Sequence, residues 1–400
     1  MTTPDLGHPD ALRELLVSRG VSPGADEEEL LRAARTARHK LHVTVLSARE
    51  SAGQPLTTEQ QAELAAYRDR LKQYQAAWSI ISDAAPHAQV VKGWTIGDHY
   101  PPGMLRAAGD LDVVCPPGEL WQAALALIGH GWELEAFTLF PSGPGADLDV
   151  RQWCHVLIEV SRPGDSDCIE EPYGVELRTA DVATSIRVPA RRLAGAPLPP
   201  AAANVIALAA ERWERPFRTR DIYDLAILAG QLDRAGLDAL SGALTVTMLW
   251  PQLRELSRLL RRSGLGRLPD QPGSRRAAWR TRAARLRRSA VLWGHPLRAA
   301  GLLATATVDA DRGAGADRLA HAVQRRIKPW RLLRLGLPLF AVPLPAVPLS
   351  AAPPEAGAGA GELKLELRGA HLVARTPVGS FLLVAGSCPA DWLEEASGRR

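Results

Sequence analysis

The sequence contains few cysteines, and none of them lies in a recognisable motif. Its 400 residues include four, and none of these forms a CxxC pair. A structural zinc site or a disulfide framework needs closely spaced or numerous cysteines, so both are disfavoured. Isolated thiols are typical of a reducing compartment, and we therefore expect a cytoplasmic protein. The four are Cys115, Cys154, Cys168 and Cys388.

Two further features are missing: a secretory signal and a long uninterrupted apolar run. The first ten residues, MTTPDLGHPD, lack the basic region followed by an apolar region that marks a signal peptide. The most apolar segment, residues 332–352, contains four prolines, which a membrane-spanning helix would not tolerate together. No repeat of fixed period is present. We therefore predict a globular protein with no membrane partner, and an apolar fraction of 46% is ample for its core.

Changes in residue pattern along the chain predict an α+β fold in five parts. A small mixed sheet is expected between helical regions, because short β-type runs alternate with helical spacing only in the second part. The first part is interpreted as a helical cap on that sheet, with specific partner binding as the alternative. The parts are 1–85 (helical), 86–198 (sheet domain), 199–330 (helical and Arg-rich), 331–361 (Pro/Ala/Gly linker) and 362–400 (small β-hairpin-like segment).

The chemistry is concentrated between Lys92 and Cys115. Asp110 and Asp112 alternate with apolar residues, so on a strand their carboxylates share one face. Paired carboxylates are hard oxygen ligands for one or two divalent cations. Lys92 and Gly93 follow a helical stretch, where a glycine turn brings backbone amides close to a phosphate. This combination predicts phosphoryl or nucleotidyl transfer.

The segments VVKG, YPPGMLRAAGDLDVV and RTRDIYDLAIL resemble the nucleotidyltransferase-like superfamily with the polymerase-β-type fold. The resemblance covers residues 88–232 and is greatest to a bacterial branch of poorly characterised nucleotidyltransferases. The last segment is also similar to the abortive-infection and toxin-type enzymes. The resemblance implies that Asp110 and Asp112 bind Mg²⁺ (or Mn²⁺) and that Lys92-Gly93 faces the triphosphate of a nucleoside triphosphate (NTP), such as ATP.

The roles of three further charged residues stay open. Arg106 is expected either to brace the loop before Asp110 or to reach a phosphate bidentately. Asp221 and Asp224 are three residues apart and share a helix face. By resemblance one of them contributes to the nucleotide site; the alternative is a salt-bridged helix that packs into the core.

The resemblance also requires a third carboxylate on a neighbouring strand, as metal ligand and base. Glu159 in HVLIEVS and Glu176 in GVELRT both alternate with apolar residues. We favour Glu159 as the catalytic and metal-binding residue, with Glu176 as its rival. A second DxD pair, Asp147 and Asp149, follows a Gly/Pro-rich loop and is interpreted as a solvated turn.

The arginines between residues 254 and 298 favour either an RNA or polyanion partner, or simple solvation of helices. Aromatic residues are sparse there, so stacking on single strands is not indicated. The sequence predicts a Mg²⁺-dependent nucleotidyltransferase that uses an NTP. Its acceptor (tRNA or other RNA, protein or small molecule) and its oligomeric state stay open. The alternatives are a catalytically degenerate protein of this fold and a basic helical nucleic-acid-binding protein.

Overall fold

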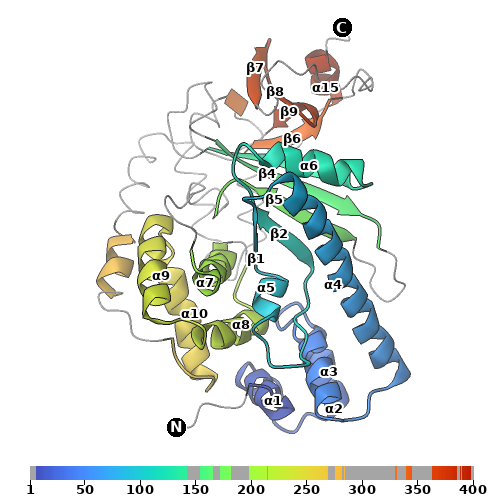
Figure 1. Cartoon of the computed structure of the whole chain (residues 1–400). Helices are drawn as coiled ribbons and strands as arrows, with labels where there is room; N and C mark the ends of the chain where they lie inside the picture. The colour runs from blue at the N-terminus through green and yellow to red at the C-terminus, as the bar shows by residue number, and fades with distance from the viewer. Residues whose placement is uncertain are drawn as a thin grey trace.

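Helices and one mixed β-sheet build the chain, so the predicted α+β class is confirmed (Figure 1). The computed structural model describes residues 6–141, 154–164, 172–181, 198–213, 215–268, 275–281, 283, 329–330, 339–344, 363–384, 388 and 390–397. Asp147, Asp149 and residues 269–274, 282 and 284–298 of the Arg-rich region lie outside these residues. Among the described helices, none is both long and apolar enough to cross a lipid bilayer.

The sheet contains nine strands in the described part of the chain, in the order β1-β2-β5-β4-β3-β6-β9-β8-β7. Only β2 and β5 run parallel among these neighbours; the other pairs are antiparallel. The strands are β1 (Gln89–Val91), β2 (Asp110–Val114), β3 (Glu133–Pro141), β4 (Cys154–Arg162), β5 (Tyr173–Arg178), β6 (Leu339–Pro343), β7 (Lys364–Arg368), β8 (His371–Thr376) and β9 (Gly379–Val384).

Helices α4 (Thr58–Ala84) and α6 (Leu120–Gly129) cover one face of this sheet (Figure 1). The start of α4 is fixed by a capping box between Thr57 and Gln60. Tyr74, Ala77 and Ile81 of α4 pack with the apolar side of α6 against strand residues in one continuous core. The opposite face of β2 is therefore the one available for a polar site.

A second core joins the N-terminal helices to the helices that follow the sheet domain. Its members include Leu12, Leu46, Ile222 and Leu256, all of them buried. Residues 1–85 are therefore more than a cap on the sheet, because their first three helices share a hydrophobic core with α7–α10. We call this unit the helical lobe. It comprises α1 (Pro9–Ser18), α2 (Glu27–Arg35), α3 (His42–Ser51), α7 (Pro200–Ala210), α8 (Thr219–Ala229), α9 (Arg234–Thr247) and α10 (Trp250–Arg262).

Two expectations about the C-terminal half need correction. Residues 339–343, inside the segment predicted as a linker, form β6, which pairs with β3 and β9. Strands β7, β8 and β9 are therefore not a separate hairpin but continue the main sheet, with α15 (Ala390–Ser397) beside them (Figure 1). The apolar alternation identified these strands, but strand pairing over 200 residues of sequence left no local signal.

Candidate functional site

Strand β2 presents its two aspartates to the helical lobe. Leu111 and Val113 point into the core beneath α4 and α6, so Asp110 and Asp112 point to the other side, as the alternation predicts. Asp110 is exposed, whereas Asp112 is only 2% exposed. The Asp110 carboxylate thus lies at the mouth of the site, and the Asp112 carboxylate lies in its wall.

The third carboxylate beside this pair is Glu176 rather than the favoured Glu159. Strand β5 lies next to β2, and Asp112 pairs directly with Glu176. Glu159 pairs with Glu176 from the far side, on β4. Because neighbouring strands are about 4.8 Å apart, Glu159 lies roughly 10 Å from β2. Of the two, only Glu176 lines the pocket between these strands and the helical lobe.

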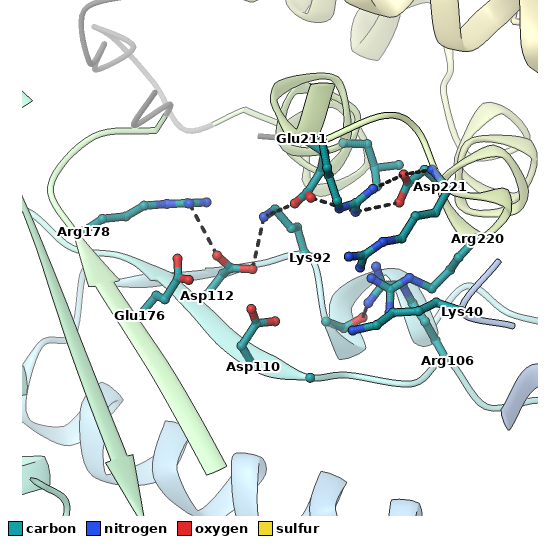
Figure 2. A pocket seen from close by; sticks show the side chains of 15 residues that line it. Lys40, Lys92, Arg106, Asp110, Asp112, Glu176, Arg178, Glu211, Arg220 and Asp221 are labelled. Carbon is teal, nitrogen blue, oxygen red and sulfur yellow. Dashed lines mark hydrogen bonds and ion pairs between the residues drawn. The ribbon is translucent and has the colours of Figure 1, made fainter. Parts of the chain in front are cut away.

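A pocket of about 270 Å³ opens between β2, β5 and the helical lobe (Figure 2). Its lining carries seven basic and five acidic side chains, so the pocket as a whole is electropositive. The basic residues are Lys40, Lys92, Arg106, Arg178, Arg215, Arg218 and Arg220; the acidic ones are Asp110, Asp112, Glu176, Glu211 and Asp221.

Lys92 connects the strand carboxylates to the helical lobe. Its Nζ lies 2.5 Å from Oε1 of Glu211 and 3.4 Å from Oδ2 of Asp112. Arg178, two residues after Glu176 on β5, approaches Oδ1 of Asp112 at 3.4 Å. Glu211 is held in turn by Arg215 at 2.7 Å. Figure 2 shows the resulting chain of alternating charges across the pocket.

The acidic end of the pocket carries mutually unfavourable negative charge. Burial, then Asp112 and Asp110, raises the pKa of Glu176 well above its usual value. Desolvation by the surrounding pocket, then the charge of Asp112, raises the pKa of Asp110. Glu211 behaves oppositely: burial alone would raise its pKa, but Lys92 and Arg215 outweigh that effect and lower it to about 2. The three strand carboxylates therefore form a group that a cation would stabilise.

The Lys92-Gly93 turn is fixed by contacts on both sides. It follows strand β1, not a helix as the sequence suggested, and precedes the short helix α5 (Trp94–Gly97). Gly93 has φ 51° and ψ −128°, a backbone conformation that residues other than glycine rarely adopt. The Lys92 amide donates to Oδ1 of the buried Asn204 on α7 at 2.8 Å. The turn therefore aims Lys92 into the pocket.

Arg106 braces this turn and does not offer a free guanidinium. Its Nε and Nη2 donate to the Asp224 carboxylate at 2.8–3.1 Å, and its Nη1 donates to the Gly93 carbonyl at 3.2 Å. Asp224 is fully buried and also accepts from Tyr100. Of the two roles expected for Arg106, the structure supports the one in which it braces the backbone, here at Gly93. Asp224 does not line the pocket.

Asp221 lines the pocket but is already engaged. It accepts hydrogen bonds from both Nη atoms of Arg215 and from the Arg218 amide. This arrangement is the salt-bridged helix that the sequence offered as the alternative to a nucleotide contact. Asp221 thereby positions Arg215, which holds Glu211.

Helix α4 supports the loop that leads into Asp110. The hydroxyl of Tyr74 donates to the Gly109 carbonyl at 2.6 Å, and Arg70 donates to the same oxygen at 2.9 Å. Arg70 also bonds to the Pro172 carbonyl just before β5. One arginine thus ties together the starts of the two strands that carry the carboxylates.

Six charged pocket residues were not predicted from the sequence: Lys40, Arg178, Glu211, Arg215, Arg218 and Arg220. Arg178 had a usable signal, because it shares the alternation of Glu176 on the same strand. Glu211 and Arg215 are spaced four apart, as a helical ion pair is, but nothing placed them near β2. Lys40 comes from the N-terminal region, far away along the chain.

The donor set has the chemistry of a divalent-cation site. Asp110, Asp112 and Glu176 supply hard oxygen ligands, and Oδ1 of Asp112 is buried without a hydrogen bond from the described residues. Within the described residues, no three acidic, His or Cys side chains converge closely enough to hold one ion together. Asp112 instead faces Lys92 and Arg178. The three carboxylates are thus the type of ligand that Mg²⁺ prefers, and one of them, Asp112, is already shared between the Lys92 and Arg178 side chains.

Comparisons of this chain with models of protein families, with curated proteins and with solved structures found no match.

Proposed function

We propose that this protein is a Mg²⁺-dependent nucleotidyltransferase that transfers a nucleoside monophosphate from an NTP to an acceptor. The observation that carries the proposal is the grouping of Asp110, Asp112 and Glu176 on two adjacent strands beside the Lys92-Gly93 turn. Phosphoryl-transfer sites depend on positioning and on charge stabilisation, and this pocket offers acids for a metal and bases for phosphates.

In this proposal each pocket residue has a defined role. The acceptor hydroxyl attacks the α-phosphorus, the bond to the bridging oxygen breaks, and pyrophosphate leaves. Lys92 neutralises the departing pyrophosphate. The Glu176 carboxylate, whose pKa is raised by burial and by Asp112, accepts the proton of the attacking hydroxyl. Mg²⁺ held by Asp110 and Asp112 would supply charge stabilisation at the phosphates.

The reaction can be tested with α-labelled NTPs. The protein is incubated with each NTP, Mg²⁺ and a cell extract, and the fraction that retains the label is identified. Labelling that requires both protein and Mg²⁺ supports the proposal. Labelling that persists when Asp110 and Asp112 are both changed to Asn rejects this assignment of the site.

Two glutamate variants separate the rival third carboxylates. Glu176→Gln is expected to lower label transfer by about 100-fold, the lower end of the range for loss of a general base. Glu159→Gln serves as the matched control and is expected to stay within about twofold of wild type, because β5 lies between it and β2. Equal loss in both variants, or loss only in Glu159→Gln, would contradict this placement.

A second candidate is a protein of the same fold that binds a nucleotide without turnover. It is favoured by the surroundings of Asp112, because the Lys92 and Arg178 side chains each lie 3.4 Å from that carboxylate and occupy the place of a metal ion. Nucleotide binding without transfer to any fraction of the extract, in the presence of Mg²⁺, would select this candidate.

A further inference from the structure

Six of the seven basic residues of the pocket fall into two groups that differ in their partners. Lys92, Arg106, Arg178 and Arg215 each lie within 3.4 Å of a carboxylate. The side chains of Arg218 and Arg220 form no ion pair with any residue that the structure describes. Both line the pocket, as does Lys40.

The two acids that act on Arg218, Asp221 and Glu211, are already bonded to other cations. Asp221 accepts two bonds from Arg215 and one from the Arg218 backbone. Glu211 is shared by Lys92 and Arg215. Burial, then the cations of Arg215 and Arg220, lowers the pKa of Arg218. Cations that repel one another in a partly buried pocket indicate an anionic ligand.

Hydrogen bonds fix the Arg220 side chain and attach the segment of Lys40 to α8. Nη1 of Arg220 donates to the Ala107 carbonyl at 2.9 Å, which fixes the guanidinium beside the loop into Asp110. The amides of Thr219 and Arg220 donate to the carbonyls of Arg38 and His39, both at 3.1 Å. The segment that carries Lys40 is thereby attached to the first turn of α8. Figure 2 shows Lys40 and Arg220 side by side across the pocket from the strand carboxylates.

We propose that Arg218, Arg220 and Lys40 form a phosphate-binding subsite that takes the terminal phosphates of a nucleoside triphosphate. Arginine guanidinium groups match phosphate oxygens in geometry and charge. A pocket of about 270 Å³ is smaller than the usual 300–1,000 Å³ of sites for drug-sized ligands, so it suits a compact polyphosphate rather than a strand of nucleic acid.

The identity of the nucleotide rests on the proposed function, but the affinity of the subsite for phosphate does not. In this arrangement the N-terminal helical region contributes directly to ligand binding through Lys40. The triphosphate would extend from Lys92 toward the helical lobe, and its α-phosphate would remain beside Asp110 and Asp112.

The test measures binding of inorganic tripolyphosphate by calorimetry, without divalent cations, so that no turnover is required. The double variant Arg218→Gln/Arg220→Gln is expected to weaken binding by at least about tenfold, the change that follows loss of one charge-assisted hydrogen bond. The matched control is Arg261→Gln/Arg262→Gln, which removes the same charge from two exposed positions of α10 that do not line the pocket. It is expected to stay within about twofold of wild type.

Two additions make the result decisive. Arg218→Gln alone, which removes no side-chain hydrogen bond to a described residue, is expected to weaken binding in a protein whose thermal unfolding is unchanged. A single-stranded RNA of twelve nucleotides tests the other phosphate source.

Equal tripolyphosphate affinity in the double variant and its control overturns the proposal. A double variant that loses RNA binding but keeps its tripolyphosphate affinity overturns it as well. Weakened tripolyphosphate binding in a protein that transfers no label retains the subsite and rejects the reaction.

Discussion

Asp110→Asn is expected to lower nucleotidyl transfer by about 1,000-fold without unfolding the protein. Asp110 is exposed at the pocket mouth and makes no ion pair or side-chain hydrogen bond with a described residue, so its loss changes stability by less than about 0.5 kcal/mol. Its carboxylate would, however, be a direct metal ligand in the proposed reaction. Removal of one preorganised charge-stabilising group costs about 10²–10³-fold.

The measurement compares label transfer and urea unfolding in the same preparations. Asp83→Asn, which changes an exposed aspartate on α4, is the matched control and should retain full transfer. Asp112→Asn is a less specific probe, because that buried carboxylate also neutralises Lys92 and Arg178. Transfer by Asp110→Asn above about one tenth of wild type would contradict the proposed role.

Asp224→Asn is expected to produce the largest loss of stability, about 3–5 kcal/mol in the free energy of unfolding. Asp224 is fully buried, and Arg106 beside it has a side chain that is 4% exposed. Breaking such a pair leaves a buried charge without compensation. Although burial alone would lower the pKa of Arg106, Asp224 outweighs that effect and raises it, which is the sign of a strongly coupled pair.

Urea unfolding of Asp224→Asn and of Glu50→Gln checks this expectation. Glu50 pairs with Arg68 at the surface, where both side chains are about two-fifths exposed, so its loss should cost no more than about 1 kcal/mol. Because Arg106 also bonds to the Gly93 carbonyl, the Asp224 variant should lose transfer activity as well. Similar small losses in both variants would show that the Arg106–Asp224 pair is not the main anchor of the turn.

The part of the site that lies on one strand could be predicted from the sequence. Alternation with Leu111 and Val113 placed Asp110 and Asp112 on one face, and the structure has them there. The Lys92-Gly93 turn also lies beside these carboxylates, although it follows β1 and not a helix. The alternation needed only the local geometry of a strand, whereas the place of the turn depends on the pairing of β1 with β2.

The choice of the third carboxylate could not be made in this way. Glu159 and Glu176 have the same alternation, so the sequence does not say which of their strands lies next to β2. That depends on β5 inserting parallel to β2 while β4 pairs with its far edge. Strand order is a tertiary property, set by packing and connection lengths rather than by the strand itself.

The helical contribution to the pocket was hidden for a similar reason. Glu211 and Lys40 line the same pocket because the N-terminal helices and α7–α10 share one core. The sequence showed both helical regions but not their association. Conversely, Asp224 looked like a site residue by its motif, yet it is a buried structural partner of Arg106.

The central claim is that this pocket binds a nucleoside triphosphate together with a divalent cation. Calorimetric titration with NTP analogues that resist cleavage between the α- and β-phosphates tests it most directly, with Mg²⁺ and then with EDTA. We expect at least one analogue to bind about tenfold or more tightly with Mg²⁺ and this difference to disappear in Asp110→Asn. Affinity that is the same with and without Mg²⁺ would contradict the account. So would a failure to bind the analogue of any of ATP, GTP, CTP and UTP.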